Sequence, residues 1–201
     1  MANFISIFRI FVALFAIALL YIRTTWAYVL ALLLTIFAFV LDGVDGYVAR
    51  KFNESSDLGS VLDIMGDRIV EASYWIVFAV MGWISILFPL VCVFRAFTTD
   101  SLRSVALSKG YTAFGAKSMQ KTKLGSFICS SRFMRISYAV AKVVAFLFLI
   151  IANTPGIEFW QHIGLFHNIT MFFAWAAIIF CVVRGIPVVV ESKSLFEKEN
   201  K

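Results

Sequence analysis

The chain has 201 residues, of which 61% are hydrophobic and 22 are phenylalanine, and its net charge is +6. An ordinary soluble domain is about 45–50% apolar, so this composition excludes one and predicts an integral membrane protein. The positive charge could suggest a nucleic-acid partner. In a membrane protein, however, basic residues mainly set orientation and meet anionic headgroups, so we expect no nucleic-acid partner.

Apolar stretches along the chain predict an all-α fold with six transmembrane helices, at residues 4–22, 27–49, 60–82, 84–106, 128–152 and 167–190. A spanning helix takes about 20 residues, so we expect one membrane domain over residues 1–201 with short connections. The first stretch begins with polar Asn3, Ser6 and Arg9. We interpret it as a span rather than a signal peptide, because no convincing small-residue cleavage site follows it.

Basic residues fall mainly after the second and fourth predicted spans and near the C-terminus, whereas the opposite connections hold essentially Arg23 alone. The positive-inside rule therefore predicts that both termini face the cytoplasm. The cysteines Cys92, Cys129 and Cys181 lie far apart in apolar segments and are expected to pack rather than to bind metal. No chelating partner accompanies the two histidines, so no chemistry is assigned to them.

Four aspartates cluster between the second and third predicted spans. Asp42 and Asp45 stand at the end of one helix, and Asp63 and Asp67 stand at the start of the next. Residues three or four apart share a helix face, so each pair points one way, and the short connection lets the two pairs converge. A single aspartate at a span boundary would be a solvated helix end, but four at matched spacing predict a site.

Four neighbouring carboxylates repel one another and therefore need protons or cations. Oxygen ligands favour Mg²⁺, Mn²⁺ or Ca²⁺, and two ions sharing carboxylates would leave positions open for phosphate oxygens. Gly46 and Gly59 lie one turn from an aspartate and remove side-chain bulk, while Arg50 can hold a phosphate. The pattern predicts phosphoryl chemistry at the cytoplasmic ends of helices 2 and 3.

The segment fits the pattern D-x2-D-G-x2-A-R-x8-G-x3-D-x3-D without exception, with eight fixed positions between residues 42 and 67. This pattern resembles the signature of the CDP-alcohol phosphatidyltransferase family. The resemblance implies that a CDP-linked lipid donates its phosphatidyl group to an alcohol and CMP leaves, with help from two Mg²⁺ or Mn²⁺ ions. It also implies a bacterial or other prokaryotic cytoplasmic membrane and a possible homodimer.

The resemblance assigns roles to the signature residues. It makes Asp42, Asp45, Asp63 and Asp67 metal ligands, and Asp67 the catalytic base that takes the acceptor proton. The nucleotide pocket would be formed by Asp45, Gly46, Ala49, Arg50 and Gly59. Asn3, Ser6 and Arg9 resemble a polar motif that precedes the first span in such enzymes, and could approach the same site.

The sequence defines the acceptor alcohol less clearly than it defines the aspartate site. The segment that begins at Arg95, and Lys121 with Thr122 after it, resemble phosphatidylglycerophosphate synthases, which favours glycerol 3-phosphate. Asp100 and the basic residues between 118 and 135 depart from that pattern and leave inositol phosphate or another polar alcohol open. The candidates for contacting an acceptor phosphate are Arg95, Arg103, Lys121, Arg132 and Arg135.

Two other classes of protein place acids in membranes. A membrane prenyltransferase binds a diphosphate through Mg²⁺, but its two acidic motifs normally lie much further apart. An ion pathway should carry polar residues through several spans, whereas these acids concentrate at one edge.

Overall fold

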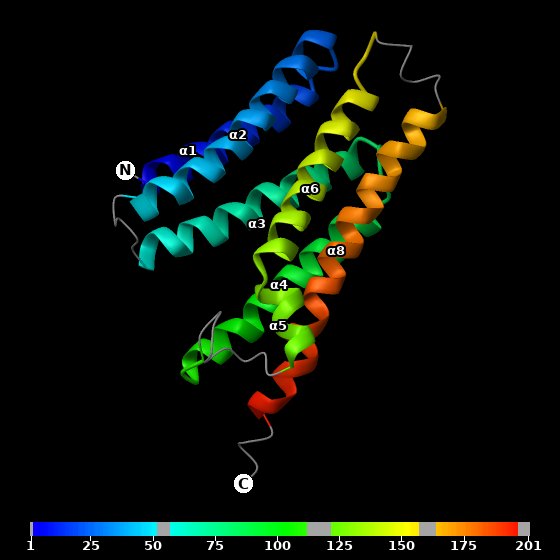
Figure 1. The fold of residues 1–201 in the computed structure, drawn as a ribbon. Coiled ribbons are helices and arrows are strands. Elements are labelled where there is room, and N and C mark those ends of the chain that lie inside the picture. The colour runs from blue at the N-terminus through cyan, green and yellow to red at the C-terminus, as the bar shows by residue number, and fades with distance from the viewer. Residues whose placement is uncertain (1, 52–56, 112–121, 157–163, 197–201) are drawn as a thin grey trace. The chain divides into compact units, whose positions relative to one another are not determined.

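The computed structural model describes residues 2–51, 57–111, 122–156 and 164–196, and every regular element in these ranges is an α-helix (Figure 1). The helices are α1 (Ala2–Leu20), α2 (Thr25–Lys51), α3 (Asp57–Val80), α4 (Leu87–Ser108), α5 (Lys123–Ser130), α6 (Arg132–Ala152) and α8 (Gly164–Phe196). The predicted all-α fold is confirmed.

The fifth predicted span, at residues 128–152, is wrong in its first turn. Ser131 has an extended conformation, with φ −64° and ψ 140°, and separates the short helix α5 from α6. The Ser131 hydroxyl accepts a hydrogen bond of 3.2 Å from the Met134 backbone N–H. This is the bond of a helix N-cap, so α6 begins at Arg132 rather than continuing from α5.

Four helices of the described chain are long and apolar enough to cross a membrane, through the segments Asn3–Leu20, Thr25–Val44, Phe133–Ala152 and Gly164–Lys193. Helices α3 and α4 have 24 and 22 residues, which is sufficient length, but both carry charged side chains. The protein is therefore a helical membrane protein, and a count of six spans stays a prediction.

The contacts divide the chain into two compact units, which are described separately. Unit 1 contains Met1–Ile86 and Val143–Met171, and unit 2 contains Leu87–Lys142 and Phe172–Lys201. Helices α6 and α8 contribute to both units.

In unit 1, α1 packs against α2 and α3 (Figure 1). The chain's N-terminal end lies beside the end of α2 and the beginning of α3. Gly66 allows the close approach of α1, because a β-carbon there would lie 3.0 Å from Ile10 Cδ1 and 3.3 Å from Arg9 Nη2. Small residues let helix backbones approach in this way in membranes, where packing rather than water exclusion holds helices together.

Unit 1 also contains a cluster of aromatic side chains from α3 and α6. Phe146 of α6 stacks on Tyr74 with ring centroids 4.9 Å apart and meets the edge of Trp75 at the same separation. The Tyr74 hydroxyl and Thr35 Oγ1 are 2.6 Å apart, so this buried hydroxyl pair is hydrogen-bonded across α2 and α3. These contacts fix α2 beside α3, and so fix the two helices that carry the aspartates.

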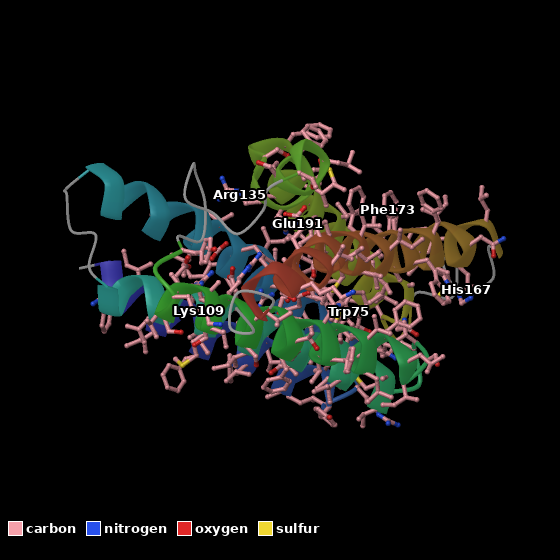
Figure 2. The ribbon with its side chains drawn as sticks, turned by 90° about the horizontal axis from the view of Figure 1, so that it is seen from below. Trp75, Lys109, Arg135, His167, Phe173 and Glu191 are labelled. Carbon is pink, nitrogen blue, oxygen red and sulfur yellow. The ribbon has the colours of Figure 1, made fainter. Side chains whose placement is uncertain are left out.

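In unit 2, α4, α5 and α8 meet around buried Ala106, Cys129 and Val188. Cys92 of α4 and Cys181 of α8 are also buried, with their sulfur atoms 3.8 Å apart. Near the C-terminal end of α8, Glu191 receives a short hydrogen bond from the Thr122 hydroxyl, which itself caps α5 by accepting from the Gly125 N–H (Figure 2). These hydrogen bonds hold the start of α5 against α8.

Candidate active site

Three of the four predicted aspartates converge in unit 1. Asp42 comes from α2, and Asp63 and Asp67 come from adjacent turns of α3. A carboxylate oxygen from each lies within 4.8 Å of the others. Their side chains are 37%, 53% and 47% exposed respectively, so the cluster is open on one side. The convergence that helical spacing predicted is therefore present for these three residues.

The fourth aspartate, Asp45, and its neighbours Gly46, Ala49 and Arg50 lie in the last turns of α2, where the side chains are outside the described part of the structure. Gly59 lies in the first turn of α3, one turn before Asp63. The helical backbone thus has the register that the signature requires, and the roles of these five residues stay predictions.

Arg9 of α1 reaches into the middle of the aspartates. Its Nη1 contacts Asp42 Oδ1 and lies 3.2 Å from Asp67 Oδ1, while its Nη2 donates to Asp63 Oδ1 at 2.9 Å. Nη2 also lies 3.3 Å from the Asp63 backbone carbonyl oxygen. The Arg9 side chain is only 5% exposed, which is tolerable at this depth because three carboxylates surround its charge. The expected approach of the N-terminal motif to the site is present at Arg9.

Gly66 is a site residue that the sequence reasoning missed. The glycines considered there were Gly46 and Gly59, yet Gly66 is the one in contact with Arg9 in the structure. The available signal was its position between Asp63 and Asp67, where a residue without a side chain leaves room for a neighbouring helix. Which helix uses that room could not be deduced from spacing alone.

The aspartate cluster suits a hard divalent cation. Its donors are carboxylate oxygens from two rigid helices, close enough to share an ion, and partly exposed so that a phosphate oxygen can also reach it. The Arg9 guanidinium already lies among these oxygens, which shows that the cluster accommodates positive charge. The residues therefore fit a metal centre.

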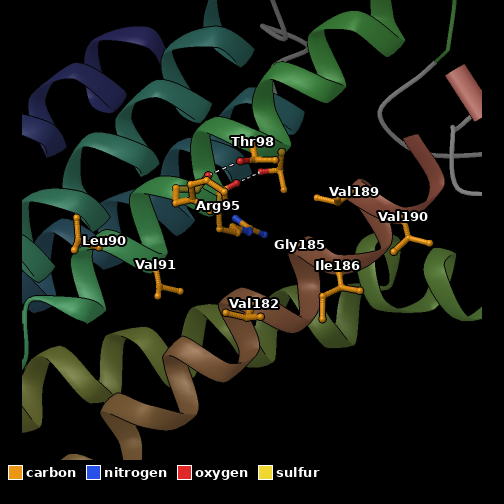
Figure 3. A pocket seen from close by; sticks show the side chains of 11 residues that line it. Leu90, Val91, Arg95, Thr98, Val182, Gly185, Ile186, Val189 and Val190 are labelled. Atoms are coloured by element: carbon orange, nitrogen blue, oxygen red, sulfur yellow. Dashed lines mark hydrogen bonds between the residues drawn. The ribbon is translucent and has the colours of Figure 1, made fainter. Parts of the chain in front are cut away.

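A second group of cations lies in unit 2. Arg95 of α4, predicted as an acceptor-phosphate residue, is buried and lines a cavity of about 660 Å³ between α4 and α8 (Figure 3). The cavity is otherwise lined mostly by apolar side chains, and Arg95 extends across it toward Gly185. A β-carbon at Gly185 would lie 2.9 Å from Arg95 Cγ, so the glycine makes room for the arginine.

Arg184, next to Gly185 on α8, was not singled out from the sequence. Its guanidinium lies 5.3 Å from the Tyr138 ring centroid, and the positive charges of Arg95 and Arg103 are near enough to repel its own. The Nε atoms of Arg95 and Arg184 are buried without a hydrogen-bond partner in the described structure. A buried Arg95 and a half-buried Arg184, each with an unused Nε donor, make a cluster that would accept an anion.

The remaining acceptor candidates are less informative. Arg103 lies on α4, 3.9 Å from Asp100 Oδ1, and Arg135 is exposed in the first turn of α6. Arg132 begins α6, but its side chain is not among those described, and Lys121 lies outside the described residues. The structure therefore groups Arg95 and Arg103 with Arg184, and leaves the other candidates as predictions.

The family model for CDP-alcohol phosphatidyltransferases matches residues 1–183, which include the aspartate cluster, Arg95 and Arg103 and end just before Arg184. The chain belongs to this family. As a CDP-alcohol phosphatidyltransferase it moves a phosphatidyl-type group from a CDP-linked lipid to an alcohol and releases CMP, and such enzymes generally depend on a divalent metal. Membership also removes the prenyltransferase and ion-pathway alternatives.

Several relatives of this phosphatidyltransferase share the same name. A CDP-diacylglycerol--glycerol-3-phosphate 3-phosphatidyltransferase of Pseudomonas fluorescens is 26% identical over 165 residues, which cover 81% of this chain and 77% of the relative. The protein of that name from Rickettsia typhi is 30% identical, over 64% of this chain and 72% of the relative. The Escherichia coli K12 protein is 32% identical over a shorter match, 34% of this chain and 37% of its own length.

Proposed function

We propose that the protein transfers the phosphatidyl group of CDP-diacylglycerol to glycerol 3-phosphate, producing phosphatidylglycerophosphate and CMP. The donor and acceptor follow the names of the bacterial relatives. The observation that carries the proposal is the convergence of Asp42, Asp63 and Asp67 within 4.8 Å in a chain of this family. The buried Nε donors of Arg95 and Arg184 in unit 2 support a phosphorylated acceptor.

Asp42, Asp45, Asp63 and Asp67 hold two Mg²⁺ or Mn²⁺ ions in this proposal. Bound there, the ions would lower the negative charge that opposes attack on the donor diphosphate and would stabilise the leaving phosphate. Gly46, Ala49, Arg50 and Gly59, with Asp45, form the pocket for the CDP moiety. The helical register of these residues beside the aspartate cluster supports this assignment.

Asp67 acts as the base. Its carboxylate takes the proton of the acceptor hydroxyl, whose oxygen forms a bond to the phosphatidyl phosphorus while the phosphorus–oxygen bond to CMP breaks. The exposure of the Asp67 side chain, 47%, supports access by an acceptor. No covalent intermediate on the protein is required.

The acceptor phosphate is bound by Arg95, Arg103 and Arg184. Charge-assisted hydrogen bonds from guanidinium groups to phosphate are strong, and the unused Nε donors of Arg95 and Arg184 are available for them. Lys121, Arg132 and Arg135 remain additional candidates by sequence. A serine or free inositol acceptor would leave these arginines without an anion, so the cluster favours a phosphorylated alcohol.

The proposed topology has six spans, with both termini and the active site at the cytoplasmic face of a bacterial membrane. The distribution of lysine and arginine along the chain supports this orientation. A homodimer, which the family resemblance implies, is also a prediction, and light scattering of the purified protein in detergent measures it.

Release of CMP tests the proposed reaction. The purified protein is incubated with CDP-diacylglycerol and Mg²⁺ or Mn²⁺, and glycerol 3-phosphate, inositol phosphate, serine and inositol are supplied separately. We expect CMP with glycerol 3-phosphate alone. CMP with inositol phosphate alone would change the acceptor and leave the arginine assignment intact, whereas CMP with serine or inositol would contradict both.

A further inference from the structure

Arg9 lies among the oxygens that the proposed metals would bind. Each described aspartate uses its Oδ1 atom to contact Arg9, through Nη1 at Asp42 and Asp67 and through Nη2 at Asp63. A guanidinium and a divalent cation cannot both occupy the centre of three oxygens that lie within 4.8 Å of one another. Arg9 and a metal ion therefore compete for the same donors.

The charges show why a resident cation is needed. Three ionised carboxylates at this separation repel one another, although both of their helices, α2 and α3, are held together by packing against α1. Arg9 cancels one of the three negative charges and connects α1 to α2 and α3. Those carboxylates compensate the burial of the Arg9 charge, since the Arg9 side chain is only 5% exposed.

We propose that Arg9 is a displaceable internal counter-cation, which holds the three aspartates together in the metal-free protein and releases their Oδ1 atoms when divalent metal binds. The inference rests on the proposed metal role of Asp42, Asp63 and Asp67. It adds that Arg9 lowers the affinity for metal, since binding must break its ion pairs, and that Arg9 stabilises the fold before metal arrives.

The close contact at Gly66 keeps the Arg9 backbone near the site after release. The Ile10 side chain packs against Gly66 and holds this turn of α1 on α3 independently of the Arg9 guanidinium, so displacement requires only the flexible Arg9 side chain to move. The freed guanidinium then stays beside the metal centre, where its fork of donors suits the diphosphate of the donor substrate.

The test measures Mn²⁺ binding to the metal-free protein by the electron paramagnetic resonance of the free ion. Arg9→Gln keeps a polar side chain of similar length and removes the charge. We expect it to bind Mn²⁺ about tenfold or more tightly, which corresponds to about 1.4 kcal/mol. Its thermal midpoint without metal should fall below that of the wild type, and the difference should shrink at saturating Mn²⁺ because metal replaces the missing cation.

Arg68→Gln is the matched control. Arg68 is one residue from Asp67 but pairs with Glu71, at 3.8 Å, so its removal changes the local charge equally without vacating the cluster. A similar rise in Mn²⁺ affinity for both variants would assign the effect to general charge and overturn the proposal. Unchanged or weaker Mn²⁺ binding by Arg9→Gln would overturn it too.

Two further outcomes are distinguishable. If the wild type and all variants are folded but bind no Mn²⁺, the proposed metal site itself fails. If Arg9→Gln does not fold, Arg9→Lys provides the measurement, because a lysine keeps the charge but lacks the fork that contacts several carboxylates at once. Tighter Mn²⁺ binding by Arg9→Lys supports displacement, and equal or weaker binding overturns it.

Discussion

Asp42, Asp63 and Asp67 all offer carboxylate oxygens, so the proposed proton-accepting role is what distinguishes Asp67 from the other two. Asp67→Asn keeps the shape of the side chain and one oxygen while removing its basicity. We expect the variant to fold and to bind CDP, and to lose about 10²–10⁴-fold in kcat. Initial rates of CMP release and nucleotide binding by calorimetry measure the two properties separately.

Asp57→Asn is the control for Asp67→Asn, because it makes the same change at the first residue of α3, which is a variable position of the signature. Its turnover should match the wild type. Near-normal turnover in Asp67→Asn would remove the residue from the base role, while loss of CDP binding together with turnover would make it a metal ligand only.

Arg184 carries the prediction about acceptor binding. Arg184→Gln removes one cation from the cluster with Arg95 and Arg103. We expect KM for glycerol 3-phosphate to rise about 10- to 100-fold, because this is the usual loss of affinity when a hydrogen bond to a charged group is removed. KM for CDP-diacylglycerol should change little. Lys109→Gln, at an exposed position after α4, removes the same charge and should leave both constants unchanged. Equal changes in both KM values for Arg184→Gln would contradict a specific role in acceptor binding.

For single residues, the sequence was sufficient to predict contacts within one helix or across a short connection. The spacing of Asp42, Asp63 and Asp67 was sufficient to predict their convergence, since helix periodicity and a short connection determine it. The partner of those residues, Arg9, comes from 54 positions away from Asp63, and Arg184 meets Arg95 from another helix. Such meetings depend on which helices pack together, and side-chain spacing within one helix does not encode that.

Among the helices, the contact of α1 with α3 depends on Gly66. Gly66→Ala places a methyl group 3.0 Å from Ile10 Cδ1 and 3.3 Å from Arg9 Nη2, so α1 must shift or Ile10 must change rotamer. Overpacking of this kind typically costs about 1–3 kcal/mol. We expect a lower thermal midpoint of the purified protein in detergent, measured by tryptophan fluorescence.

Gly43→Ala provides the comparison, because no atom lies within 4 Å of the β-carbon it would add to α2. Alanine favours a helix over glycine by up to about 1 kcal/mol, so this variant should be as stable as the wild type or slightly more stable. If both variants lose stability equally, the close contact of α1 with α3 at Gly66 is not the cause.

The pairing of α4 with α8 can be tested with native residues. The sulfur atoms of Cys92 and Cys181 are 3.8 Å apart, and a disulfide needs about 2.05 Å. We expect copper phenanthroline, which supplies the oxidant, to convert these two thiols to a disulfide in isolated membranes. Mass spectrometry of proteolytic peptides should find α4 linked to α8, and Cys92→Ala should abolish the link. A link from Cys181 to Cys129 instead would contradict this pairing.

Helix boundaries illustrate a second limit of sequence patterns. Hydropathy located each long helix within a few residues, because the apolar runs are longer than the uncertainty of their ends. It passed over the break at Ser131, because the apolar residues 127–129 before it and 133–134 after it outweigh polar Ser130 and Arg132 in a hydropathy average. The signal was the hydroxyl of Ser131 three residues before Met134, a capping position that an average over many residues does not detect.

For the whole molecule, the open question is whether α3 and α4 cross the membrane. Both are long enough, at 24 and 22 residues, but because of their charged residues they are not among the four clearly apolar helices of the described chain. Most of those charges lie in the first half of α3 and the second half of α4, with Glu71 and Arg95 nearer the middle of their helices, and the turn between the two helices carries no charged residue. Two crossing helices with polar ends on the cytoplasmic side would produce this pattern.

The side of the membrane that this turn occupies decides between six spans and four. With the proposed cytoplasmic termini, which either span count allows, the turn before α4 is outside the cell if α3 and α4 cross and inside it if there are four spans. We expect a cysteine at exposed Ser85 to react with a membrane-impermeant maleimide in intact cells, in a protein whose three native cysteines are replaced by alanine. Ser108→Cys, at the other end of α4, should react only after the membrane is permeabilised. Labelling of both positions only after permeabilisation would establish that α3 and α4 remain on the cytoplasmic side, and the aspartates would then lie in a helical layer at the membrane surface rather than at the ends of two spans.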